Sequence, residues 1–187
     1  MATVILDMDG VMVDLHKGLA RWLRFDMADY TPGEYDLWKV YPHHMKGFSW
    51  DDLGENFWAN IEPTSEASQI MQMIHGHNSF VFTCPINFYD NKPIKGAMEG
   101  KLRWLQKYMP IHFEEGRYLF GRHKHFIVNS DMILIDDHDE YVNAFNAAGG
   151  RAILFPRLWN SEHENADKGM ELVKAVFETW TKNELKI

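Results

Sequence analysis

The stretch Val4-Ile5-Leu6-Asp7-Met8-Asp9-Gly10 decides the fold that we expect. Apolar residues are followed at once by two aspartates and a glycine, a pattern typical of a buried strand and the turn at its carboxyl end. Residues i and i+2 of an extended segment share a face, so both carboxylates can point the same way. Such a pair attracts a hard divalent cation, and one carboxylate can attack phosphorus while the other moves protons.

Four further apolar segments rich in β-forming residues follow along the chain. We predict five strands, at residues 4–6, 80–82, 117–120, 132–135 and 152–155. Helix-like segments lie between and after them, at 94–108, 140–148 and 166–181. The alternation of strand and helix predicts an α/β protein with a parallel sheet.

The interval between the first two predicted strands is far longer than a crossover needs. We therefore predict a small cap domain at residues 15–78, and a core formed by residues 1–14 and 79–187. The interval holds four of the seven tryptophans: Trp22, Trp38, Trp50 and Trp58. Its aromatic residues either form the cap's own core, or two or three of them face a cleft and stack on a ligand ring.

A second pair of aspartates follows the fourth predicted strand. The carboxyl ends of parallel strands meet at one edge of a sheet, so Asp136 can complete a cation site with Asp7 and Asp9. Alternatively, Asp137 or Asp139 caps the helix that follows. Both interpretations can hold for different residues of this pair and its neighbours.

Donors for an anion occur at two more strand ends. Thr83 can donate to a phosphoryl oxygen, or it is an ordinary strand-end threonine. Arg122 and Lys124 concentrate positive charge in an acidic chain, where they either neutralise a phosphate or belong to a solvated loop. Cys84 is not expected to be a nucleophile, because a cysteine-dependent phosphatase needs an arginine where this chain has Asp90.

Composition excludes several classes of protein. The chain has 187 residues and a net charge of −8, so we expect neither a stable nucleic-acid complex nor a membrane partner. One cysteine excludes an internal disulfide and fits a cytoplasmic location. The start lacks the basic region of a signal peptide, and no phosphate-binding P-loop, dinucleotide or serine-esterase motif occurs. The histidines at 43–44 and 75–77 lack partners at metal-ligand spacing.

The order Asp-x-Asp-Gly, Thr, Lys, Asp-Asp resembles that of the haloacid dehalogenase superfamily of phosphotransferases. Within it the chain is most similar to the 5'(3')-deoxyribonucleotidases. The similarity rests on residues 7–14, 82–86, 122–124 and 134–137, and residues 47–50 and 57–63 resemble the cap motifs of that family. It extends over nearly the whole chain.

The resemblance implies a Rossmann-like sheet with a small helical cap inserted after the first strand. It also implies a magnesium-dependent phosphomonoesterase that converts deoxyribonucleoside monophosphates to nucleoside and phosphate through an aspartyl-phosphate. Asp7 would be the nucleophile and Asp9 the general acid and base. Magnesium would be bound by the carboxylates of Asp7 and Asp136 and by the backbone carbonyl of Asp9.

The substrate contacts follow from the same resemblance. Thr83 and Lys124 would hold the phosphoryl group, with Arg122 assisting nearby. Phe48 and Trp50 would contact the nucleobase.

Departures from the family pattern border the expected pocket. Leu15 stands where the family tends to have a phenylalanine, and Cys84, Asn87 and His138 replace a serine, a lysine and an arginine. They leave the substrate preference open. The alternatives are a phosphatase for another small-molecule or polynucleotide phosphate, and a binding protein with a vestigial site. A dimer is possible, and the sequence does not decide it.

Overall fold

Five parallel strands form the centre of the computed structural model, which describes residues 2–87 and 90–184. The strands are β1 (Thr3–Leu6), β2 (Asn78–Thr83), β3 (Tyr118–Phe120), β4 (Met132–Asp136) and β5 (Arg151–Leu154). Their order in the sheet is β3-β2-β1-β4-β5. The predicted α/β class and parallel sheet are confirmed, and each predicted strand end lies within two residues of the observed one.

Alternate residues of β1 face opposite layers of helices, as the two-residue repeat of a strand requires. Val4 and Leu6 belong to a cluster with residues of α4 (Ala67–Met73), α5 (Ala97–Tyr108) and α8 (Gly169–Glu184). Ile5 packs instead with Val142 and Phe145 of α7 (Asp139–Ala147). Each of these strand side chains is fully buried, which stabilises the fold by about 1.5–3 kcal/mol per residue.

The three predicted helices of the core are confirmed, with ends that shift by at most three residues. The segment before α8 is a 3-10 helix, η4 (His163–Lys168), so α8 begins later than predicted. The remaining core elements are α6 (Pro110–Glu114) and η3 (Lys124–Ile127), which follow α5 and β3.

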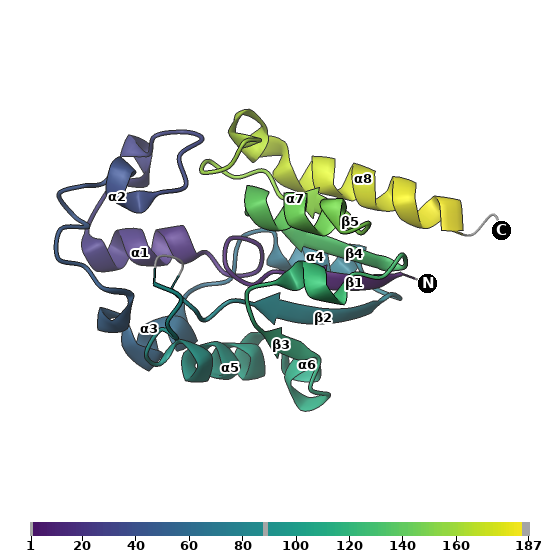
Figure 1. The fold of residues 1–187 in the computed structure, drawn as a ribbon, viewed down its shortest axis with the longest axis horizontal. Helices are drawn as coiled ribbons and strands as arrows, with labels where there is room; N and C mark the ends of the chain where they lie inside the picture. The colour runs from purple at the N-terminus through teal and green to yellow at the C-terminus, as the bar shows by residue number, and fades with distance from the viewer. Residues whose placement is uncertain (1, 88–89, 185–187) are drawn as a thin grey trace.

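Residues between β1 and β2 form α1 (Leu15–Leu23), η1 (Met27–Asp29), α2 (Leu37–Val40), η2 (Trp50–Asp52), α3 (Gly54–Asn60) and α4. Figure 1 shows α1, α2 and α3 beyond the carboxyl ends of the strands. The outgoing and returning segments lie side by side, because Val13 pairs with Pro63 and the Asp14 amide donates to the Glu62 carbonyl. The domain boundaries stay a prediction. Residues 1, 88–89 and 185–187 of the predicted core range lie outside the described residues.

Close packing of α3 on α5 positions one side of the site. A Cβ atom on Gly100 would lie 2.5 Å from both the Trp58 Cβ and the Glu55 carbonyl oxygen. Only glycine allows the helices to approach so closely. The approach places Trp58 of α3 beside Lys101 of α5, whose Nζ lies 5.1 Å from the indole ring centre.

Candidate active site

Three buried carboxylates meet at the carboxyl edge of the sheet. Leu6 pairs with Ile135 in the register of β1 and β4, and the Asp7 amide donates to the Ile135 carbonyl at 2.9 Å. Asp7 therefore lies beside Asp136 at the end of β4. One oxygen each from Asp7, Asp136 and Asp137 lie within 4.8 Å of one another.

Lys124 is the first cation of this cluster. Its side chain is 1% exposed, and its ammonium contacts Asp7 Oδ1 and donates to Asp136 Oδ2 at 2.6 Å. Burial by itself would lower the pKa of Lys124, but Asp136 and Asp7 outweigh burial and raise the pKa above its usual value. The ammonium therefore stays charged and holds both carboxylates.

Lys101 of α5 is a second buried cation, and the sequence analysis missed it. Its ammonium contacts Asp9 Oδ2 and donates to Thr83 Oγ1 at 2.9 Å. The second oxygen, Asp9 Oδ1, is buried and has no hydrogen-bond partner among the described residues. A sequence signal for Lys101 did exist, because it lies on the same face of the helix as the buried residues Ala97 and Trp104, where a lysine is unusual.

The charges of the cluster fit a hard divalent cation. Among the described residues, the ammonium groups that contact the four carboxylates of Asp7, Asp9, Asp136 and Asp137 are those of Lys124 and Lys101, and the Arg157 guanidinium adds one positive charge that acts on Asp137. Burial raises the pKa of Asp7 to about 7, and Asp136 and Asp9 add to the rise against the effect of Lys124. Burial also raises the pKa of Asp137, with Asp7 and Asp136 adding to it. This shortage of positive charge, with oxygen donors from the carboxylates, suits a hard divalent cation.

Asp137 is held in the cluster by its surroundings. Trp159 Nε1 donates to Asp137 Oδ2 at 2.5 Å. Gly10 has a φ of +78°, and a Cβ atom there would lie 2.1 Å from the same oxygen. The turn that Gly10 permits thus passes close to Asp137. Trp159 also stacks on His16 of α1, with ring centres 3.6 Å apart, which links this carboxylate to the segment that covers the site.

The cap of α7 is not the one predicted. His138 is the N-cap residue, and its Nδ1 accepts from the Glu140 amide at 3.3 Å. The prediction that Asp137 or Asp139 caps the helix is therefore wrong. Asp137 belongs to the carboxylate cluster, and Asp139 accepts hydrogen bonds from the amide and the hydroxyl of Ser161.

A cavity of about 380 Å³ opens above the carboxylates, a volume within the range of small-molecule sites. Asp7, Asp9, Asp136 and Asp137 line one end. Apolar and aromatic side chains from both sides of the site line much of the remainder: Leu15, Leu19, Tyr35, Leu37, Trp38, Trp50, Trp58, Ile86, Ile94 and Tyr141. The cavity thus combines buried carboxylates with a mainly apolar and aromatic lining.

Residues 1–171 match the model of the family described as 5' nucleotidase, deoxy (pyrimidine), cytosolic type C protein. The chain belongs to this family of 5'-nucleotidases. It is 27% identical over 172 residues to the human mitochondrial 5'(3')-deoxyribonucleotidase, an alignment that covers 84% of this chain and 71% of the human protein. The chain is thus a nucleotidase-family member of the haloacid dehalogenase superfamily.

Solved structures support the fold of this nucleotidase-family chain. A haloacid dehalogenase-like protein from Agrobacterium tumefaciens superposes with a TM-score of 0.59 at 13% identity, covering 97% of this chain and 99% of its own. L-2-haloacid dehalogenase from Xanthobacter autotrophicus gives 0.51 at 14% identity, with 96% and 88% covered. The predicted Rossmann-like fold of this superfamily is therefore confirmed. Among the described residues, no helix combines the length and apolar character needed to cross a bilayer.

Several residues predicted to contact substrate lie around the cavity of this nucleotidase-family chain. Leu15, Trp50 and Cys84 line it. Burial raises the pKa of the Cys84 thiol, which disfavours the thiolate and fits a residue that is not a nucleophile. Trp38 and Trp58 also line it, in accord with the alternative that some aromatic residues of the insert face a cleft.

Phe48 and Arg122 lie outside the set of lining residues. Phe48 packs against other aromatic rings, with centres 5.8 Å from Trp22 and 5.4 Å from Trp50. Arg122 follows β3, and its guanidinium donates to the Asn91 side chain. Their roles toward a substrate stay predictions.

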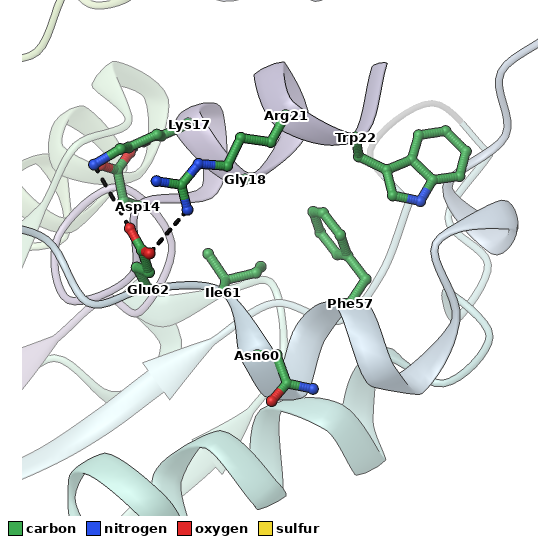
Figure 2. Close-up of a pocket in the computed structure, with 9 residues that line it drawn as sticks. All are labelled: Asp14, Lys17, Gly18, Arg21, Trp22, Phe57, Asn60, Ile61 and Glu62. Carbon is green, nitrogen blue, oxygen red and sulfur yellow. Dashed lines mark hydrogen bonds and ion pairs between the residues drawn. The ribbon is translucent and has the colours of Figure 1, made fainter. Parts of the chain in front are cut away.

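A second hollow of about 290 Å³ lies between α1 and α3 (Figure 2). Both of its cations are paired, because Glu62 contacts Lys17 at 3.6 Å and Arg21 at 2.9 Å. Asp14 adds a further negative charge to the lining. The charged groups of this hollow are exposed and paired with one another, whereas those of the cavity above Asp7 are largely buried, so that cavity is the candidate site.

Proposed function

We propose that this protein is a magnesium-dependent phosphomonoesterase that hydrolyses deoxyribonucleoside monophosphates. The observation that carries the proposal is the cavity itself, which the carboxylates of Asp7 and Asp9 line together with three tryptophans, Trp38, Trp50 and Trp58. The family description and the name of the human relative, both of deoxynucleotide enzymes, support the same substrate class. The proposal goes beyond the family assignment in naming the substrate and the ion.

Mg²⁺ would be held by the carboxylates of Asp7 and Asp136 and by the backbone carbonyl of Asp9. When bound, the ion neutralises negative charge on the phosphoryl group and on the carboxylates around it. A structural relative from Bacillus subtilis, with a TM-score of 0.51 at 11% identity, is bound to magnesium. For this chain the support is the excess of buried carboxylates over ammonium groups.

Asp7 begins the proposed reaction by attacking phosphorus in line with the ester bond. The bond between phosphorus and the ester oxygen breaks, and its electron pair stays on the leaving oxygen. That oxygen takes a proton from Asp9, and the nucleoside is released. Lys101 holds Asp9 Oδ2 in place while the buried Oδ1 has no other partner, so one oxygen is fixed and the other is available for proton transfer.

Water completes the reaction. Asp9 now removes a proton from a water molecule, whose oxygen forms a bond to phosphorus. The bond between phosphorus and Asp7 breaks, which releases phosphate and restores the Asp7 carboxylate. Asp9 ends the cycle protonated, as it began. Lys124, which contacts Asp7, and Thr83, on the neighbouring strand, hold the phosphoryl group throughout.

The opposite end of the cavity would bind the nucleoside. Stacking of a base on an aromatic ring contributes about 1–3 kcal/mol in other base-binding sites. Trp50 is the predicted stacking residue that lines the cavity, and Trp38 and Trp58 lie on the same lining. Replacing Phe48 and Trp50 together by alanine should therefore lower deoxynucleotide turnover at low substrate about tenfold and leave a small generic phosphate little changed.

The deciding experiment measures phosphate release from a panel of substrates with Mg²⁺ present. The panel contains deoxyribonucleoside and ribonucleoside monophosphates with 5' or 3' phosphates, sugar phosphates, and DNA with a 3'-phosphate end. We expect the highest kcat/KM on deoxyribonucleoside monophosphates. A preference for sugar phosphates or DNA ends would replace this proposal with the alternative phosphatase, and release from no substrate would point to a binding protein.

The cellular location follows separately from composition. A cytoplasmic protein is what the single cysteine favours, and it stays a proposal because the human relative is mitochondrial by name. Fractionation of the source cells would test it.

A further inference from the structure

One side chain of the loop between η1 and α2, Tyr35, reaches from the cap into the charged end of the cavity. About 45% of the residue is exposed, yet it lines the cavity together with Asp7, Asp9 and Asp137. The ring lies against His138 of the core, with centres 4.2 Å apart at an interplanar angle of 68°. The residue thus lies partly in solvent, while its ring contacts the residue that directly follows Asp136 and Asp137 in the chain.

The loop that carries Tyr35 is fixed at both sides. Within the cap, the Tyr30 hydroxyl donates to the Glu34 carbonyl at 2.8 Å, and the Glu34 carboxylate accepts from the Asp36 amide at 3.0 Å. Across to the core, the Gly33 amide donates to the Leu158 carbonyl at 2.7 Å. These bonds hold the backbone on either side of position 35, and the contact with His138 orients the ring.

The Tyr35 hydroxyl is a hydrogen-bond donor at neutral pH. Burial raises the pKa of the phenol well above its usual value, and the charges of Asp137, Asp7 and Asp9 raise it further. Among the described residues, the hydroxyl forms no hydrogen bond. The hydroxyl is therefore open to an acceptor that a ligand brings into the cavity.

The groups around the Tyr35 hydroxyl indicate which ligand atom would accept its hydrogen bond. The carboxylates whose charges raise the pKa of this hydroxyl include Asp7 and Asp9. The phosphoryl group would react between these two residues. The lysines of the site, Lys124 and Lys101, are already engaged with carboxylates. Besides Lys124, a phosphoryl oxygen entering this end of the cavity would meet the protonated phenol of Tyr35, a donor that has no hydrogen-bond partner among the described residues.

We propose that Tyr35 donates a hydrogen bond to a non-bridging oxygen of the phosphoryl group, so that the cap itself completes the anion site. This inference rests on the proposed function in taking a phosphomonoester as the ligand. It assigns a substrate-binding role to a cap residue at the phosphate end, separate from the aromatic contacts to the base. The contact exists only while the cap covers the core.

The test compares the full-length protein with its Tyr35→Phe variant, with Mg²⁺ present. We expect kcat/KM to fall about tenfold, and by the same factor for a deoxyribonucleoside monophosphate and for p-nitrophenyl phosphate. The inhibition constant of inorganic phosphate should rise by a similar factor. The melting temperature of the ligand-free variant should not change, because the hydroxyl has no protein partner to lose.

Tyr41→Phe is the matched control. The Tyr41 hydroxyl donates to the Asp26 carbonyl at 2.7 Å inside the cap, and the residue does not line the cavity. This variant should melt at a lower temperature while its inhibition by phosphate stays that of the wild type.

Three results would overturn the proposal for Tyr35. The first is wild-type kinetics and phosphate inhibition in Tyr35→Phe. The second is a loss confined to the nucleotide, which would place the hydroxyl on the nucleoside. The third is a lower melting temperature of the ligand-free variant, which would make the hydroxyl a structural group.

Calorimetric titration with inorganic phosphate separates this inference from the proposed function. If the wild type hydrolyses no monoester, the proposed function fails. The affinity for inorganic phosphate, measured with Mg²⁺ present, still tests the contact with Tyr35 in that case. Weaker binding by Tyr35→Phe than by the wild type supports the contact, and equal binding overturns it.

Discussion

Asp7→Asn is the substitution that tests both the chemistry and the electrostatics of the site. Asparagine keeps the size of the side chain but has no anionic oxygen to attack phosphorus. We expect turnover to fall by at least about a thousandfold. Lys124 keeps its 2.6 Å bond to Asp136 in the variant, so the substitution leaves no buried ammonium without a partner.

The same substitution should stabilise the protein when no divalent cation is present. Burial raises the pKa of Asp7 from 3.8 to about 7, so ionising it in the folded state is unfavourable by at most about 4 kcal/mol. Part of this stabilisation is offset, because the buried amide of asparagine is destabilising wherever its donors and acceptor lack hydrogen bonds. We therefore expect a net gain of about 1–2 kcal/mol, or roughly 2–8 °C in melting temperature for a chain of this size.

The sign of the pH dependence follows from the direction of the shift. A group whose folded pKa is raised contributes stability below its unfolded pKa and loses it as pH rises through the folded value. The wild type without cation should thus lose stability between about pH 4 and pH 7. The advantage of Asp7→Asn should grow over that window, stay constant above it, and shrink in saturating Mg²⁺.

Differential scanning calorimetry at pH 5 and pH 8, with EDTA and with Mg²⁺, measures these differences, and a phosphate-release assay measures turnover. Near-normal turnover by a folded Asp7→Asn protein would refute Asp7 as the nucleophile. A variant that melts below the wild type at pH 8 in EDTA would refute the argument that the carboxylate cluster lacks positive charge.

Three further predictions concern neighbouring groups. EDTA should abolish activity reversibly, and Mg²⁺ at a hundred times its dissociation constant should stabilise the protein by about 2.7 kcal/mol, or roughly 5–11 °C; full activity in EDTA would contradict this. Lys101→Met should lower kcat by about a hundredfold with little change in KM, because Asp9 loses the contact that orients it; an unchanged kcat would show that Lys101 is only structural. Cys84→Ser should retain turnover within about threefold, and loss of activity without loss of folding would reopen a role for the thiol.

Local patterns in the sequence were sufficient for the elements and for much of the motif order. Short apolar segments that end in Asp7, Thr83 and Asp136 predicted strands whose polar ends share one edge of a sheet, because burial on both faces requires a continuous apolar run. The resemblance to the nucleotidases rested on the same segments. The family match confirms that resemblance.

Only the tertiary structure brought distant side chains to those strand ends. Lys101 contacts Asp9 across 92 positions of the chain, and Tyr35 lines the same cavity as the carboxylates from a loop that sequence patterns place only within the insert. Asp137 lies in the cluster, while His138 caps α7 instead. The spacing of apolar residues in the sequence indicates which face of a helix or strand is buried. The partner of a buried polar group depends instead on how the helices pack. In this protein the close contact of α3 with α5, and of the cap loop with the core, decided those partners.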